Sequence, residues 1–111
     1  MNFAIDRTEE RSLLTVKEER IDAHNSGELK ECLLDLLEKG LQLLIIDLSH
    51  VRFIDSSGLG ALLSGYKNAN LRHARLILAG VQPRVQSMFE LTRLHRVFEI
   101  IDQPDQLPVG Q

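Results

Sequence analysis

A polar, glycine-containing turn between an apolar strand and a helix constrains the fold of this chain most strongly. The turn is Ile54-Asp55-Ser56-Ser57-Gly58-Leu59-Gly60, and the stretch before it, from Leu43 to Phe53, is largely apolar. An apolar run such as Leu43–Leu48 is typical of a central strand that is covered on both faces. After the turn, apolar residues recur at helical spacing, at Leu59, Leu62, Leu63, Tyr66 and Ala69. The sequence therefore predicts a strand, a turn and a helix in succession, as in α/β folds.

The two serines of this turn fit two interpretations. Either Ser56 or Ser57 caps the helix, because a side-chain oxygen can accept hydrogen bonds from the unpaired amides of the first helical turn. Alternatively, a serine hydroxyl lies at the positive end of the helix dipole, where a phosphate group is well accommodated. The two roles are compatible, since a good cap position also tolerates a phosphate.

The N-terminal part of the chain predicts two strands and one helix. Apolar and polar residues alternate around Phe3–Ile5 and around Leu13–Val16, which indicates a hairpin with one buried face. A single apolar stripe then follows at Leu29, Cys32, Leu33, Leu36 and Leu37. Its spacing predicts a helix. We expect this helix to begin at a capping box of Asn25 and Glu28 and to end at Gly40.

The C-terminal part predicts a strand, a helix and a last strand. Leu76–Ala79 and Val97–Ile101 are typical of short strands, and Pro83 suits the first position of a helix, where its missing N–H is not needed. The predicted order over residues 1–111 is β-β-α-β-α-β-α-β. We expect a single α/β domain with a mixed β-sheet packed against α-helices, and a frayed tail over residues 103–111.

The composition narrows the class of protein. The chain has 111 residues, of which 43% are hydrophobic and 26% charged, and these values suit one globular domain. Its net charge of -3 argues against nucleic acid as a partner. Its one cysteine, Cys32, permits no intramolecular disulfide and is expected to be a small core residue. With no signal peptide and no apolar run near the roughly 20 residues of a membrane helix, we expect a cytoplasmic protein without membrane contact.

The sequence contains no familiar catalytic or metal-binding pattern. The histidines, His24, His50, His73 and His95, lack the spacing of metal ligands. Gly58-Leu59-Gly60 lacks the third glycine of a dinucleotide loop, and neither neighbouring serine lies in a G-x-S-x-G nucleophile elbow. We therefore expect no enzymatic activity, no metal and no cofactor. A small hydrolase with His24 or His95 as its base stays open as an alternative.

The stretch from Leu44 to Gly60, LIIDLSHVRFIDSSGLG, resembles the signature of STAS domains. Among these it is most similar to the bacterial anti-sigma factor antagonists. The resemblance extends over nearly the whole chain, although only Phe53–Gly60 is specific and the remainder matches in pattern. It implies a mixed sheet packed with helices.

The resemblance also implies a switch in partner binding. In such proteins the first serine after the aspartate, here Ser56, is phosphorylated. The unphosphorylated form binds an anti-sigma factor with a histidine-kinase-like ATPase fold, and the sigma factor is released. The same partner phosphorylates the serine with ATP, and a PP2C-type phosphatase reverses the modification. On this basis Asp22 lies at the partner surface. The other residues expected there are Asp55, Ser57, Gly58 and Leu59.

Each residue of the turn has an expected role. We expect Ser57 to cap the helix or to support the loop. Asp55 either caps the helix or orients the Ser56 hydroxyl. Gly58 and Gly60 are expected to allow close backbone approach and tight packing at the start of the helix.

The chain departs from the family pattern in the turn before the first helix. A glycine usually opens a Gly-x-[Leu/Ile]-Asp pattern there, whereas this chain has Glu19 and retains Asp22. Because glycine often supplies a positive φ, the conformation of this turn is not predicted by the resemblance. A second function within the family also stays open. The chain would then be a STAS subunit of a lipid-transport or stress-signalling assembly in which Ser56 is never modified.

Overall fold

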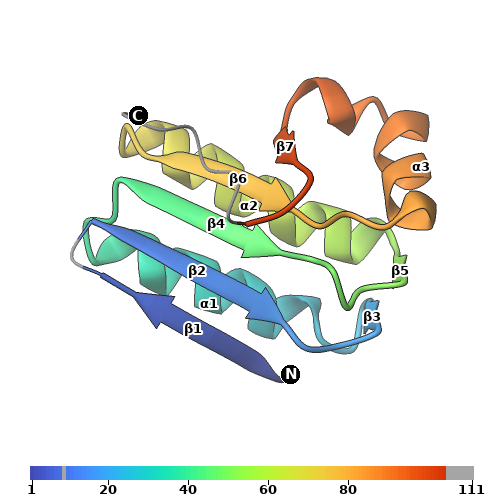
Figure 1. The fold of residues 1–111 in the computed structure, drawn as a ribbon, viewed down its shortest axis with the longest axis horizontal. Helices are drawn as coiled ribbons and strands as arrows, with labels where there is room; N and C mark the ends of the chain where they lie inside the picture. Colours follow the sequence, from blue (N-terminus) through green and yellow to red (C-terminus); the bar gives the residue numbers. More distant parts are fainter. Residues whose placement is uncertain (9, 105–111) are drawn as a thin grey trace.

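The computed structural model describes residues 1–8 and 10–104. Five strands form the main sheet, in the order β1-β2-β4-β6-β7 (Figure 1). They are β1 (Phe3–Arg7), β2 (Arg11–Val16), β4 (Leu43–Asp47), β6 (Arg75–Ala79) and β7 (Glu99–Ile101). β1 pairs antiparallel with β2, whereas the other neighbours pair in parallel. The predicted mixed sheet is confirmed.

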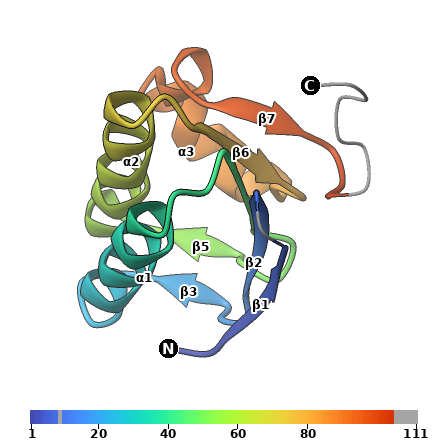
Figure 2. The same ribbon diagram turned by 90° about the vertical axis from the view of Figure 1, so that its left-hand side faces the viewer.

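Helices α1 (Ser26–Glu38) and α2 (Ser56–Leu71) lie side by side on one face of this sheet (Figure 2). A third helix, α3 (Pro83–Leu91), begins at the predicted proline and is followed by a short 3-10 helix (Leu94–Arg96). The predicted order of these strands and helices is confirmed. In the described part of the chain, no helix has the length and apolar character needed to cross a membrane.

The C-terminal boundaries differ from the prediction. The last strand begins at Glu99 and not at Val97, because Phe98 turns into the core and packs against the rings of Tyr66 and Phe89. Of the tail expected over residues 103–111, residues 105–111 lie outside the described residues.

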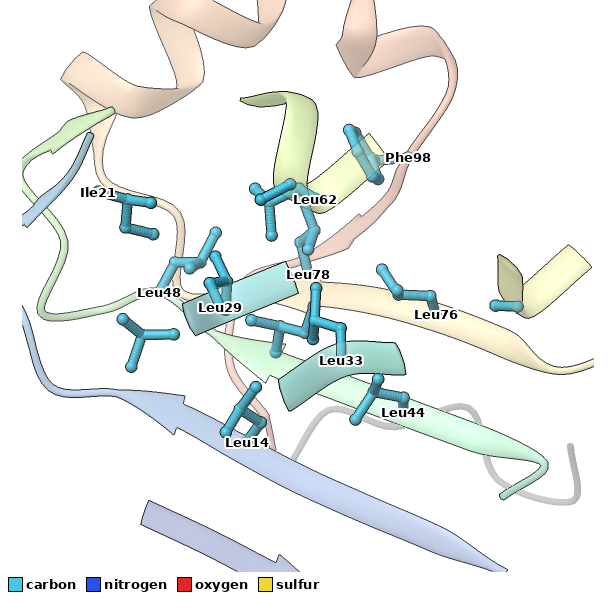
Figure 3. Close-up of a cluster of buried hydrophobic side chains, with 14 of the residues drawn as sticks. Leu14, Ile21, Leu29, Leu33, Leu44, Leu48, Leu62, Leu76, Leu78 and Phe98 are labelled. Carbon is cyan, nitrogen blue, oxygen red and sulfur yellow. The ribbon is translucent and has the colours of Figure 1, made fainter. Parts of the chain in front are cut away.

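Buried aliphatic side chains fill the space between the main sheet and its helices (Figure 3). They include Leu14, Leu44, Leu76 and Leu78 from the strands, Leu29 and Leu33 from α1, and Leu62 from α2. A Cβ on Gly65 of α2 would lie 2.8 Å from Leu33 Cδ1, so the two helices pack closely at this glycine. Cys32 lies only partly buried at the edge of this core, where burial raises the pKa of its thiol.

A second, two-stranded parallel sheet lies beyond the carboxyl ends of β2 and β4 (Figure 1). It pairs β3 (Arg20–Ile21) with β5 (Phe53–Ile54), and its two isoleucines are fully buried. The sequence predicts only connectors here, because a strand of two residues has no periodic signal of its own. This small sheet carries the turns that lead into α1 and α2.

The turn at Glu19 does not use the conformation that requires glycine. Among the described residues other than glycine, a positive φ occurs only at His73 and Arg93. The Glu19 carbonyl accepts hydrogen bonds from the amides of Arg52 and Phe53, at 2.8 and 3.1 Å. The backbone at position 19 thus joins the two segments of the small sheet, and an exposed glutamate side chain is compatible with this role.

Candidate functional site

The start of α2 is capped by Asp55 and by neither serine. Asp55 has an extended backbone, and its Oδ1 accepts a hydrogen bond from the Gly58 amide at 3.0 Å. Ser56 and Ser57 are the first two residues of the helix. The prediction of a serine cap is therefore wrong, while the alternative that Asp55 caps the helix is confirmed. The helix begins one residue earlier than a cap at Ser56 would allow.

Gly58 lies where no side chain fits. A Cβ at this position would lie 2.6 Å from Ile54 Cγ1, 2.8 Å from Ile21 Cγ2 and 2.9 Å from the Ile21 carbonyl oxygen. The close approach predicted for Gly58 is confirmed. The same prediction for Gly60 is wrong, since a Cβ there would have no neighbour within 4 Å. Gly60 lies two residues after Gly58, a rotation of roughly 200° around the helix axis, so its Cα faces away from the core.

The site residues differ in their accessibility. Ser56 is exposed, Asp55 and Ser57 are half-buried, and Gly58 and Leu59 are buried. Of the two serines, Ser56 therefore presents its hydroxyl more openly to another protein. Phosphorylation of Ser56 stays a prediction, as does partner contact by Asp22, Asp55, Ser57, Gly58 and Leu59. For Leu59, burial of the side chain leaves little surface for such a contact.

Asp22 lies in a turn that is held by Asn25. The Asp22 amide donates to Asn25 Oδ1 at 2.8 Å, and Asn25 Nδ2 donates to the Arg20 carbonyl at 2.8 Å. The Asp22 Oδ1 accepts from the His24 amide at 2.9 Å. Because its side chain is engaged in the turn, Asn25 makes no capping hydrogen bond to α1. The predicted capping box is therefore wrong, and its other member, Glu28, pairs with the Met1 amino group.

The small sheet brings these two turns together. Ile21 and Ile54 are partners in the parallel register, and the Asp55 amide donates to the Ile21 carbonyl at 3.1 Å. Since side chains alternate along a strand, Arg20 and Phe53 face away from the core, opposite to these isoleucines. The Arg20 guanidinium lies 4.5 Å from the centre of the Phe53 ring. Its Nε lies 3.7 Å from the Asp22 Oδ2.

Arg20 is a site residue that sequence reasoning missed. Its position two residues before Asp22 could have placed it on the same side of a strand. That signal depends on knowing that a strand exists there, and two residues do not reveal one.

The reactive groups at this site are serine hydroxyls, which can accept a group that is transferred to them by another protein. Within the described residues, no histidine ring is hydrogen-bonded to Ser56 or Ser57. Nor do the described residues include a group of three or more His, Cys, Asp or Glu that could hold a metal ion. A serine nucleophile needs a base within hydrogen-bond reach, so the arrangement gives no support to the hydrolase alternative.

The STAS domain family model matches residues 2–107. The anti-sigma-B factor antagonist of Listeria monocytogenes is 36% identical over 80 residues, which are 72% of this chain and 70% of that protein.

Two solved structures share the fold. A putative anti-sigma factor antagonist from Thermotoga maritima has a TM-score of 0.82 at 23% identity, covering 94% of this chain and 89% of that one. The anti-sigma factor antagonist SpoIIAA, in its unphosphorylated form, has a TM-score of 0.73 at 19% identity, covering 95% and 92%.

Proposed function

The chain belongs to the STAS domain family and, within it, to the anti-sigma factor antagonists, and on this basis we propose that phosphorylation of Ser56 controls its binding to an anti-sigma factor. The unphosphorylated form binds the anti-sigma factor and frees a sigma factor. Phosphorylated Ser56 ends that complex. The observation that carries the choice of residue is the exposure of Ser56 as the first residue of α2, beside a half-buried Ser57 and an Asp55 that is engaged as the cap.

The domain itself tolerates the modification. A phosphate adds about -1.5 to -2 charges at pH 7. The helix start stabilises a negative charge at an exposed position by about 0.3–1 kcal/mol. Because Ser56 is exposed and its side chain makes no hydrogen bond within the described residues, phosphorylation removes no contact that holds the fold together.

Inhibition therefore takes place at the interface. The phosphate lies beside Asp55, and Asp22 lies on the neighbouring turn, so a partner that covers this surface has to desolvate several negative charges. Burying a charge that lacks a full complement of cations costs several kcal/mol. A micromolar complex has about 8 kcal/mol of binding free energy. Electrostatic and steric exclusion is enough to dissociate such a complex, without a change in the conformation of this domain.

The family resemblance supports two partners for the cycle. The anti-sigma factor has a histidine-kinase-like ATPase fold and transfers the γ-phosphoryl group of ATP to the Ser56 oxygen, which leaves ADP. A PP2C-type phosphatase hydrolyses the phosphoserine and releases inorganic phosphate. Both reactions are catalysed by the partners, and this chain is their substrate in the cytoplasm.

Intact-mass analysis of the protein purified from its own cells tests this proposal. A species about 80 Da heavier that maps to Ser56 is expected, as for one added phosphoryl group. Ser56→Ala should bind the anti-sigma factor permanently and Ser56→Asp should bind it weakly, with Ser57→Ala as the matched control that still switches. If Ser56→Ala were phosphorylated stoichiometrically, the switch would be Ser57. If no such species formed in any growth condition, a subunit of a lipid-transport or stress-signalling assembly would be the better function.

A further inference from the structure

Arg20 is a positively charged residue on the outward side of the small sheet, which leads into the start of α2 and Ser56. Ile21 and Ile54 point into the core, so their neighbours Arg20, Asp22, Phe53 and Asp55 alternate to the other side. The Arg20–Asp22 contact agrees with this placement. One cation and two carboxylates thus lie on the outward side of the small sheet, next to the segment that leads into α2.

The Arg20 side chain is oriented but weakly bound. The Phe53 ring, 4.5 Å from its guanidinium, favours one orientation of the planar group by a cation–π interaction. Its ion pair with Asp22 is long, at 3.7 Å, and its side chain is 64% exposed. Exposed ion pairs of this kind are weak. The remaining guanidinium N–H groups donate to no acceptor among the described residues.

We propose that Arg20 binds the phosphate of phosphorylated Ser56, exchanging its contact with Asp22 for two hydrogen bonds to phosphate oxygens. This inference rests on the proposed function and concerns the same site. A guanidinium matches a phosphate with two parallel N–H donors, and the dianion attracts it more strongly than a single carboxylate does. The main chain supplies the proximity, because the amide preceding Ser56 is bonded to the carbonyl following Arg20.

The other charged groups near the site are less suited than Arg20 to bind the phosphate. Asp22 and Asp55 repel the phosphate. Arg52 precedes Phe53 and, by alternation, faces the other way, where it lines a hollow with Gln82 and Arg84. His24 lies two residues after Asp22 in the exposed turn, so an experiment has to separate its effect from that of Arg20.

The exchange alters two features of the partner surface at once. Phosphorylation adds a dianion, and it also withdraws an exposed arginine from any carboxylate that the anti-sigma factor places there. Arginine is enriched among the residues that contribute most to protein interfaces. Its withdrawal therefore adds to the exclusion that the phosphate itself produces.

The second ionisation of the phosphate provides a direct measurement. The full chain with phosphoserine incorporated at position 56 during translation is titrated by phosphorus NMR. A neighbouring guanidinium favours the dianion and lowers this pKa, whereas the carboxylates of Asp22 and Asp55 raise it, so the difference between variants isolates the effect of Arg20. Arg20→Ala should raise it by about 0.5 or more, and Arg20→Lys, which keeps the charge but loses the planar fork, should give an intermediate value. Arg7→Ala, at the opposite end of the sheet, removes the same charge and should leave the pKa unchanged.

Two results would overturn the inference. One is an identical phosphate pKa in the parent chain and in Arg20→Ala. The other is a rise of the pKa in His24→Ala in place of Arg20→Ala. Circular dichroism of each variant confirms that the exposed substitution has left the fold intact. Because translation installs the phosphoserine, absence of phosphorylation in cells would refute the proposed function and leave this measurement unaffected.

Discussion

The starts of α1 and α2 share one layout but are held in different ways. Each follows a buried isoleucine of the small sheet and an aspartate, as Ile21-Asp22 and Ile54-Asp55. At α2 the aspartate caps the helix directly, and the helix begins with the next residue. At α1 the aspartate binds the amide of His24 instead, and the helix begins only at Ser26, after a turn.

The difference comes from what fills the space behind each aspartate. At α2 the bare backbone of Gly58 packs on the two isoleucines, so the helix lies directly against the small sheet. At α1 the side chain of Asn25 fills the turn and binds backbone groups on both sides of Ile21. Ser56 therefore lies at a helix start that is fixed by the close packing of the Gly58 backbone against the small sheet. Asp22, one of the charged neighbours of Ser56, lies in a turn that is held by the Asn25 side chain.

The largest expected loss of stability comes from a substitution that disrupts the close packing at the start of α2. Gly58→Ala should lower the free energy of unfolding by about 2–3 kcal/mol, because the new methyl group meets two side chains and a carbonyl oxygen. Gly60→Ala in the same helix is the matched control and should raise stability by about 0.5–1 kcal/mol, since alanine favours the helix. Urea denaturation of both variants tests the pair. Equal effects would show that packing does not distinguish the two glycines.

The next largest loss of stability is expected from a substitution that loosens the turn before α1. Asn25→Ala removes two hydrogen bonds of the side chain and should cost about 1–2 kcal/mol in urea denaturation. Asn25→Ser supplies a good helix cap but cannot reach both backbone groups. It should therefore remain destabilised. Full stability of Asn25→Ser would mean that this residue acts as a cap after all.

A smaller loss of stability is expected from a substitution that removes the cap of α2. Asp55→Ala should cost about 1 kcal/mol, the usual value for a lost N-cap. Asp55→Asn keeps the acceptor oxygen and should retain most of the stability. Ser57→Ala, measured by the same thermal or urea unfolding, should change it by less than about 0.5 kcal/mol. The reverse order of the alanine variants would assign the cap to Ser57.

The smallest expected effect concerns Ser56 itself. Ser56→Asp places a negative charge on the first residue of α2 and should stabilise the fold by less than about 1 kcal/mol, an effect that high salt removes. Unfolding at low and high salt measures it. A loss of more than about 1 kcal/mol would place the switch in the conformation of this domain and not at the partner interface.

Long-range periodic signals made the main fold predictable, and short-range details of the site escaped prediction. The apolar runs and the stripe of α1 are repeated signals, so the main sheet and its helices follow from them. The choice among Asp55, Ser56 and Ser57 as cap depends on where the first turn begins, and each type of side chain can serve. Gly58 and Gly60 look alike in the sequence, and only the packing of one helix face against Ile21 separates them.

The pairing of β3 with β5 also has a consequence for the folding pathway. Its two strands are about as far apart in the chain as β2 and β4, but they share two residue pairs where β2 and β4 share five, so fewer contacts offset the entropy of closing a loop of similar length. Because its few pairs offset less of that entropy, we expect the small sheet to assemble after β2, α1 and β4 have come together. An incompletely folded chain would then lack the surface around Ser56. A kinase or a partner that recognises this surface would select chains that have finished folding.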